Sequence, residues 1–172
     1  GAFIALNVVT LRALVQPLGA GDIVINEIHY APADKTVPEE FLELYNNSDA
    51  DVDISGWYFS AGLGFEFRQG TVIPGRGYLV VAQNPTELRN LYGEMPMVGP
   101  FSGRLSNEGE NIVLRNASGV REDDVDYGVG FPWPTAPGAG GFSMELLHPD
   151  LDNNLGGSWR LSNPDLTGSA DT

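Results

Sequence analysis

Turn-forming residues recur along this chain too often to leave room for long helices. Of its 172 residues, 22 are glycine and 12 are proline. Between them lie short runs of β-branched and aromatic residues, such as IVINEIHY at 23–30 and GYLVVAQ at 77–83. Runs of this composition form strands, and the closely spaced turn residues connect them. The pattern predicts an all-β fold, either a sandwich or a barrel.

One segment, NPTELRNLYG, is predicted to be a helix. Asn84 is a good N-cap, Pro85 suits the first helical position, and Gly93 can end the helix. Farther along, NASG ends in Gly119, at a point where a hairpin turn requires a positive φ. We therefore expect one short helix among the strands.

The chain is strongly acidic, with a formal net charge of −14, and Lys35 is its single lysine. Phosphate binding needs clustered basic residues, so we expect no nucleic-acid partner. The acidity serves either solubility and mutual repulsion or the binding of divalent cations. The absence of cysteine excludes disulfides and thiol chemistry, and it suits an exported domain with a core large enough to do without them.

The first 21 residues differ in character from the rest. The segment at 2–17 is apolar, but it is shorter than a membrane-spanning helix and is interrupted by Asn7, Arg12 and Gln16. We therefore expect no membrane insertion. Its alternation indicates a strand. We interpret residues 1–21 as the remnant strand of a preceding domain plus a linker, in a fragment of a longer protein. Such a strand could associate with this domain's sheets or with a second copy.

Four blocks of the sequence resemble the lamin tail domain family, in its bacterial type. They read IVINEIHY, EFLELYNNSDADVDISGWYF, GTVIPGRGYLVVAQNP and LSNEGENIVLRNASG. The resemblance covers roughly residues 22–163 and leaves a C-terminal tail at 164–172. It implies an immunoglobulin-like β-sandwich, to which the capping residues above add one short helix. It also implies an accessory or interaction role beside other domains.

The second of these blocks has the alternation of a strand with one buried face. Leu42 and Leu44 are predicted to face the core, while Glu43 faces away from it. Trp57 is the largest apolar side chain in the block, and we predict that it is a buried core residue.

Asp49, Asp51 and Asp53 have the alternating spacing that opens a calcium-binding loop. The sixth position of such a loop should be glycine but is Ile54, and the twelfth should be glutamate but is Ser60. We therefore interpret the triplet as an acidic turn between two strands, with a metal site as the weaker alternative.

A second polar cluster follows the regular strands, in HPDLDNNLGGSW. Asp150, Asp152 and Asn154 are candidate ligands for a surface Ca²⁺, because hard cations bind carboxylate and amide oxygens. The alternative, which we favour, is an Asx-rich turn without metal, since the closing glutamate is missing. Apart from this possible Ca²⁺, no cofactor is expected.

Glu27, His29 and Glu43 form a third candidate group. Alternation places Glu27 and His29 on one face of a strand, and Glu43 could lie across from them. Two carboxylates and an imidazole can bind a transition metal. The alternative, which we favour, is a solvated sheet face with a cross-strand pair.

The glycine- and proline-rich segment GVGFPWPTAPGAGGF at 128–142 carries Phe131 and Trp133. Prolines restrict such a loop and lower the cost of ordering it on binding. Exposed aromatic rings would then form a ligand platform for sugar rings or a protein partner. The alternative is that Trp133 folds back to cover one open end of the sandwich.

No motif for catalysis is found. GFSME around Ser143 lacks the second glycine of a nucleophile elbow, and GAGG is neither a P-loop nor a dinucleotide motif. We predict no catalytic residues and no enzyme activity. The predicted function is a non-catalytic binding or interaction module of a larger secreted or cell-surface bacterial protein. Its partner would be an unknown protein or polysaccharide, and the alternative is a calcium-assisted carbohydrate-binding domain.

Overall fold

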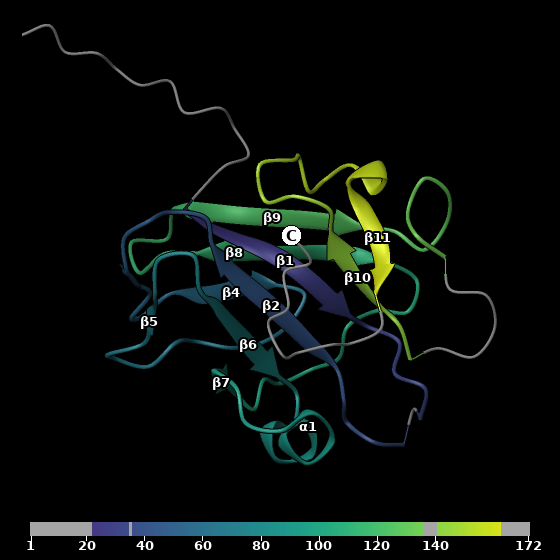
Figure 1. The fold of residues 1–172 in the computed structure, drawn as a ribbon, viewed down its shortest axis with the longest axis horizontal. Coiled ribbons are helices and arrows are strands. Elements are labelled where there is room, and N and C mark those ends of the chain that lie inside the picture. Colours follow the sequence, from purple (N-terminus) through teal and green to yellow (C-terminus); the bar gives the residue numbers. More distant parts are fainter. Residues whose placement is uncertain (1–21, 35, 136–140, 163–172) are drawn as a thin grey trace, which may run out of the picture.

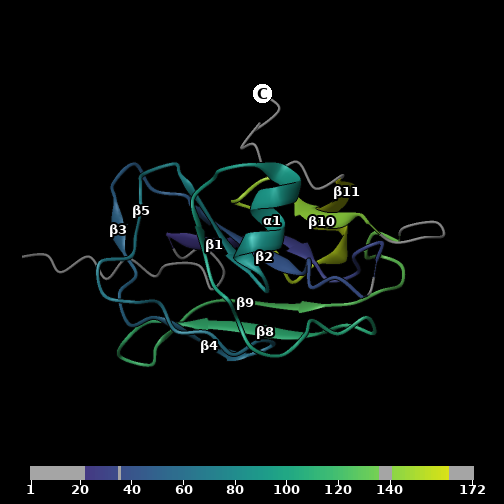
Figure 2. The same cartoon turned by 90° about the horizontal axis from the view of Figure 1, so that it is seen from below.

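The computed structural model describes residues 22–34, 36–135 and 141–162. Two β-sheets face each other with the core between them (Figures 1 and 2). The larger sheet has the strand order β11-β10-β1-β2-β6-β7, the smaller sheet has the order β4-β8-β9, and β3 pairs with β5 in a separate ribbon. This arrangement confirms the predicted all-β, immunoglobulin-like sandwich.

The strands of the larger sheet are β1 (Ile23–His29), β2 (Phe41–Asn46), β6 (Tyr78–Ala82), β7 (Met97–Val98), β10 (Ser143–Leu146) and β11 (Trp159–Ser162). The remaining strands are β3 (Val52–Asp53), β4 (Tyr58–Ala61), β5 (Val72–Ile73), β8 (Glu110–Arg115) and β9 (Arg121–Tyr127). The described residues contain one α-helix, α1 (Pro85–Tyr92), and a short 3₁₀-helix at Gly156–Ser158. All of the sheet pairings are antiparallel except that of β6 with β7.

Strand β1 is the centre of the larger sheet, and all seven of its residues are buried. Its register with β2 shifts between Ile25 and Glu27, which makes Asn26 an extra, bulged residue. β10 pairs with β1 at Glu27 and Ile28, so the Ile25 N–H lies beyond this pairing. That N–H donates instead to the carboxylate of Asp123 on β9, at 2.7 Å. A buried hydrogen bond thereby joins the two sheets.

The predicted strand alternation is confirmed in β2, where Leu42 and Leu44 lie fully buried in the main core. The prediction for Trp57 is wrong. Trp57 packs against the core but is only partly buried; it lies in a turn, where its N–H donates to the Ile54 carbonyl at 3.0 Å. Phe59, two residues farther along, takes the inner position.

The predictions of a helix and a hairpin are confirmed. Asn84 accepts hydrogen bonds from the first turn of α1, Pro85 begins the helix, and Gly93 ends it with a φ of 86°. The β8–β9 hairpin turns at Asn116 and Gly119, where φ is 81° and the Gly119 N–H donates to the Asn116 carbonyl at 2.8 Å.

Helix α1 covers part of the outer face of the larger sheet. Its buried residue Leu88 forms a second apolar cluster with Phe41, Val80 and Ala82. These sheet residues alternate with the inward-facing ones of β2 and β6, so both faces of the sheet are apolar at this place.

The predicted remnant strand and linker at 1–21 and the C-terminal tail at 164–172 lie outside the described residues. Their proposed roles therefore stay predictions. Within the described ranges, no helix combines the length and apolar character needed to cross a membrane.

Candidate functional site

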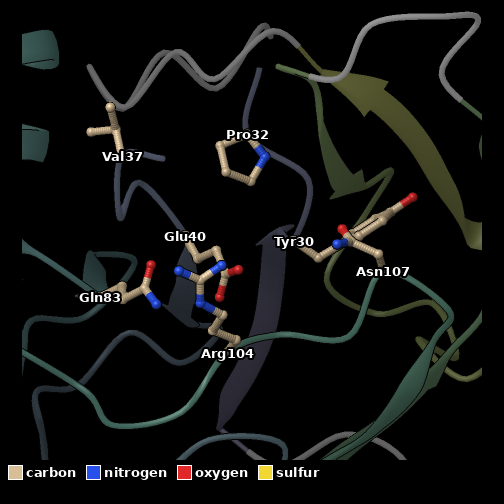
Figure 3. A pocket seen from close by; sticks show the side chains of 7 residues that line it. All are labelled: Tyr30, Pro32, Val37, Glu40, Gln83, Arg104 and Asn107. Atoms are coloured by element: carbon tan, nitrogen blue, oxygen red, sulfur yellow. The ribbon is translucent and has the colours of Figure 1, made fainter. Parts of the chain in front are cut away.

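A small pocket opens to solvent beside the edge of the larger sheet where β1 and β6 end and β2 begins. Three segments form it: the β1–β2 connection, the residue after β6, and the loop before β8. Its lining residues are Tyr30, Pro32, Val37, Glu40, Gln83, Arg104 and Asn107. Figure 3 shows Glu40, Gln83 and Arg104 gathered on one side, with Tyr30 and Asn107 on the other. Polar groups thus face the pocket from both sides.

Hydrogen bonds between these segments fix the carboxylate side of the pocket. Glu40 Oε2 accepts from the buried N–H of Leu105 at 2.7 Å, and the Glu40 carbonyl accepts from the Gln83 N–H at 2.8 Å. Gln83 Nε2 donates to the carbonyl of Gly103 at 3.2 Å. Burial raises the pKa of the Glu40 carboxyl, and the Leu105 N–H and the nearby Arg104 guanidinium act against that rise. The carboxylate is therefore held in place before any ligand arrives.

Both sides of the pocket carry polar side-chain groups that form no hydrogen bond within the protein. Within the described part of the chain, the side chains of Arg104 and Asn107 and the Tyr30 hydroxyl form no hydrogen bond or ion pair. The Tyr30 ring packs against the ring of Tyr127, with centroids 5.3 Å apart. Among the described residues, the hydrogen bond to Glu40 is made at Oε2, so Oε1 is also available, beside the guanidinium of Arg104. The pocket offers both donors and acceptors to a ligand.

Phe131 and Trp133, the predicted ligand platform, have different surroundings. The Phe131 side chain is 99% exposed. Trp133 packs against the core, with its ring 6.1 Å from that of Trp159. A Cβ on Gly156 would lie 2.7 Å from the backbone nitrogen of Trp133, so only glycine allows this approach. Trp133 thus packs on the core and anchors the loop that exposes Phe131.

Asp150 and Asp152, two of the candidate Ca²⁺ ligands, lie exposed on the loop after β10. Asp150 Oδ1 accepts from Asn47 Nδ2 at 2.7 Å. Asp152 Oδ1 accepts from the backbone N–H of Asn154 at 3.0 Å, the hydrogen bond of an Asx turn. Both carboxylates have protein partners and remain open to solvent, so Ca²⁺ binding here stays a prediction.

The third candidate ligand, Asn154, binds the backbone of β9. Its Oδ1 accepts from the Asp126 N–H at 2.8 Å, and its Nδ2 donates to the Asp124 carbonyl at 3.0 Å. These two bonds are the ones that a neighbouring strand would make. The amide of Asn154 therefore completes the outer edge of β9.

The aspartates of the alternating triplet each bind a different protein group. Asp49 pairs with the guanidinium of Arg76 at 2.9 Å, and Asp51 accepts from the N–H of Gly75 at 3.0 Å. Asp53 accepts from the backbone N–H two residues along the chain, at 2.9 Å. This geometry supports the interpretation of the segment as an acidic turn.

Glu27, His29 and Glu43 are buried, which corrects the expectation of a solvated sheet face. The bulge brings the Asn26 amide next to Glu43, where Nδ2 donates to Oε1 at 3.0 Å, and the Ser143 hydroxyl donates to Glu27. Burial raises the pKa of Glu43 to about 7 and lowers that of His29 to about 4. Across the described ranges, no three His, Cys, Asp or Glu side chains are grouped closely enough to hold a metal ion.

A buried polar network around Asp123 was not predicted. Asn153 Nδ2 donates to Asp123 Oδ2 at 2.8 Å, and the Asn153 carbonyl accepts from the indole of Trp159 at 2.8 Å. Burial raises the pKa of Asp123 to about 7. A signal was present in REDDVDY, because alternation places Asp123 on the same face as the core residues Val125 and Tyr127.

The polar pocket was not predicted either. No local motif joins Tyr30, Glu40, Gln83 and Arg104, which come from three separate segments. The available signal was weak: Tyr30 and Gln83 each come directly after a buried strand. Residues at such strand ends frequently line ligand sites, but the sequence does not show which ends meet.

The chain was compared with protein families and with curated proteins. The model of the lamin tail domain family matches residues 16–129. The matched range includes all of the pocket-lining residues, whereas β10, β11 and the loop with Phe131 lie beyond it. The comparison with curated proteins finds no match.

Proposed function

The chain belongs to the lamin tail domain family, whose fold is an immunoglobulin-like β-sandwich, and from this premise we propose that it is a non-catalytic binding module. We place it in a larger secreted or cell-surface bacterial protein. Its partner is an unknown protein or polysaccharide. Because proteins with this fold have many unrelated functions, the function must be argued from a site on its surface.

The observation that carries the proposal is the unused hydrogen-bonding capacity of the pocket. The side chains of Tyr30, Arg104 and Asn107 form no hydrogen bond or ion pair among the described residues, while Glu40 and Gln83 are held by backbone contacts. Walls that are already fixed need little ordering on binding, which favours affinity. Concave sites with a few convergent polar groups are the usual places for small ligands, and this one, with a volume of about 30 Å³, has room for one part of a ligand whose remainder lies outside it.

The composition of the pocket supports a binding role without catalysis. In the part of the chain that the structure describes, its lining contains one carboxyl group, Glu40, and no serine, cysteine or histidine. General acid–base catalysis by carboxyl groups commonly uses two of them on either side of the reacting bond. Burial raises the pKa of the Tyr30 hydroxyl, so this group stays protonated at neutral pH.

Binding is tested by NMR titration of the ¹⁵N-labelled protein with neutral sugars, amino acids and short peptides. We expect one class of ligand to shift the Leu105 amide and the Gln83 side-chain resonances, because both groups lie on the fixed wall. Arg104→Ala should weaken binding and so reduce the shifts at a given ligand concentration, and the matched control Arg68→Ala, at another exposed arginine, should retain them. If no ligand moves the pocket resonances, the pocket is not the binding site.

The second candidate is a calcium-assisted carbohydrate-binding domain. The observation in its favour is the exposure of Asp150 and Asp152 on one loop. Calcium titration in the presence and absence of glycans, followed by the melting temperature, distinguishes it from the first candidate. A rise that needs both Ca²⁺ and a glycan supports calcium assistance, whereas identical melting curves contradict it.

A further inference from the structure

We propose that the pocket binds a neutral, polyhydroxylated ligand: one sugar unit of a polysaccharide. This inference rests on the proposed binding function of the pocket and adds the chemistry of the ligand. Three properties of the lining residues support it, namely their charge, their hydrogen-bonding pattern and their apolar surface.

The charges at the pocket disfavour a charged ligand of either sign. An anion would meet the carboxylate of Glu40, which also feels the repulsion of the nearby Glu110, within a chain of net charge −14. A cation would meet the guanidinium of Arg104, which lies close enough to act on Glu40. A neutral ligand avoids both repulsions.

The hydrogen-bonding groups match hydroxyls, which donate and accept at once. The guanidinium of Arg104 and the amide of Asn107 supply donors. Tyr30 contributes its ring and directs its hydroxyl away from Glu40 and Arg104 (Figure 3). Oε1 of Glu40 and Oε1 of Gln83 supply acceptors on the same side as Arg104, across the pocket from Asn107 (Figure 3). Adjacent hydroxyls on a sugar ring can therefore be held between the two walls.

Apolar surface separates these polar groups. The ring of Tyr30 is held against Tyr127, and Pro32 and Val37 complete the wall (Figure 3). Aromatic and aliphatic surface of this kind contacts the C–H face of a sugar, while its hydroxyls reach the polar groups. Because Pro32 is buried and Tyr30 is packed, the wall is formed before binding.

The test uses the full chain and four free probes: glucose, galactose, mannose and N-acetylglucosamine. We expect at least one sugar to shift the Leu105 and Gln83 resonances with a dissociation constant on the order of 1 mM, as suits one small ligand in an open pocket. Arg104→Ala and Asn107→Ala should each weaken binding by about tenfold. The exposed residues Arg68 and Asn90 provide matched controls, since their alanine variants should bind like the parent.

The outcomes separate this inference from the proposed function. If acetate, lysine or glycine shifts the pocket resonances and the four sugars do not, the sugar chemistry is overturned while the pocket remains a binding site. If neither sugars nor charged probes shift them, both proposals are overturned. Sugar-induced shifts confined to Phe131 and its neighbours would also overturn the inference, because they would place sugar binding on the aromatic loop.

Discussion

Replacement of Asp123 tests the buried hydrogen bond that connects the two sheets. Its Oδ2 accepts from the Ile25 N–H at 2.7 Å and from Asn153 Nδ2 at 2.8 Å, and all three residues are buried. Asp123→Ala leaves two buried donors without a partner, each costing about 1–3 kcal/mol. The expected loss in unfolding free energy is therefore about 2–6 kcal/mol. Asp123→Asn keeps an oxygen acceptor at the same place, so its unfolding free energy at pH 5 should be close to that of the parent.

The pH dependence makes the test sharper. The native pKa of Asp123 is raised from 3.8 to about 7, so between these values the folded state binds a proton that the unfolded state has released. The contribution of this protonation to the unfolding free energy is then fully present below pH 4, and it is lost as the pH rises through the native pKa of about 7. The shift corresponds to about 4 kcal/mol as an upper bound. Asp123→Asn removes this term, so the variant should be more stable than the parent at pH 8.

Urea unfolding at pH 5 and pH 8, followed by tryptophan fluorescence, measures the effect. Glu43 adds a second term of the same sign, since its pKa is also raised to about 7, whereas the lowered pKa of His29 acts in the opposite direction. Both residues are present in the parent and the variant, so their terms cancel in the comparison. The matched control is Asp126→Asn, at an exposed position of β9. An Asp123→Asn protein with the pH dependence of the parent would refute the reasoning.

Three further outcomes are expected. Trp133→Ala should lower the unfolding free energy by about 2 kcal/mol, because it removes a ring that packs against the core. Phe131→Ala should change it by less than about 0.5 kcal/mol, because Phe131 is exposed. Chemical denaturation measures both variants, and equal losses would contradict the assigned packing. Calorimetry should show weak Ca²⁺ binding, with a dissociation constant of roughly 10⁻⁴–10⁻³ M, that is weakened by Asp152→Asn and unaffected by Asp51→Asn; the reverse pattern would move the site to the acidic turn. Removal of residues 1–21 should preserve the melting transition and alter only self-association in sedimentation experiments, and loss of folding would show that the segment belongs to the domain.

The fold could be predicted because its signals are local. Alternation in β2 identified Leu42 and Leu44 as core residues, and the caps Asn84 and Gly93 fixed the helix. A strand pattern does not show what covers its second face, which is why Glu43 was expected in solvent and is buried. Nor does it show where an element ends relative to the core, which is why Trp57 is less buried than expected.

The polar sites could not be predicted, because they form between distant segments. The Ile25 N–H meets Asp123 only because a bulge and a short β10 leave it unpaired within its own sheet. Glu40 meets Leu105 across 65 positions of the chain. Such contacts depend on register and loop path, which composition and periodicity leave undetermined.

The amide of Asn154 has a consequence for how copies of this domain behave when they are crowded. An edge strand with free N–H and C=O groups is a template onto which another chain can add a strand. Asn154 occupies the Asp126 N–H and the Asp124 carbonyl of β9, so a strand approaching this edge must first displace a side chain from the protein's own loop. One neutral amide thus disfavours edge-to-edge aggregation at β9, and it does so without adding charge to an already acidic strand.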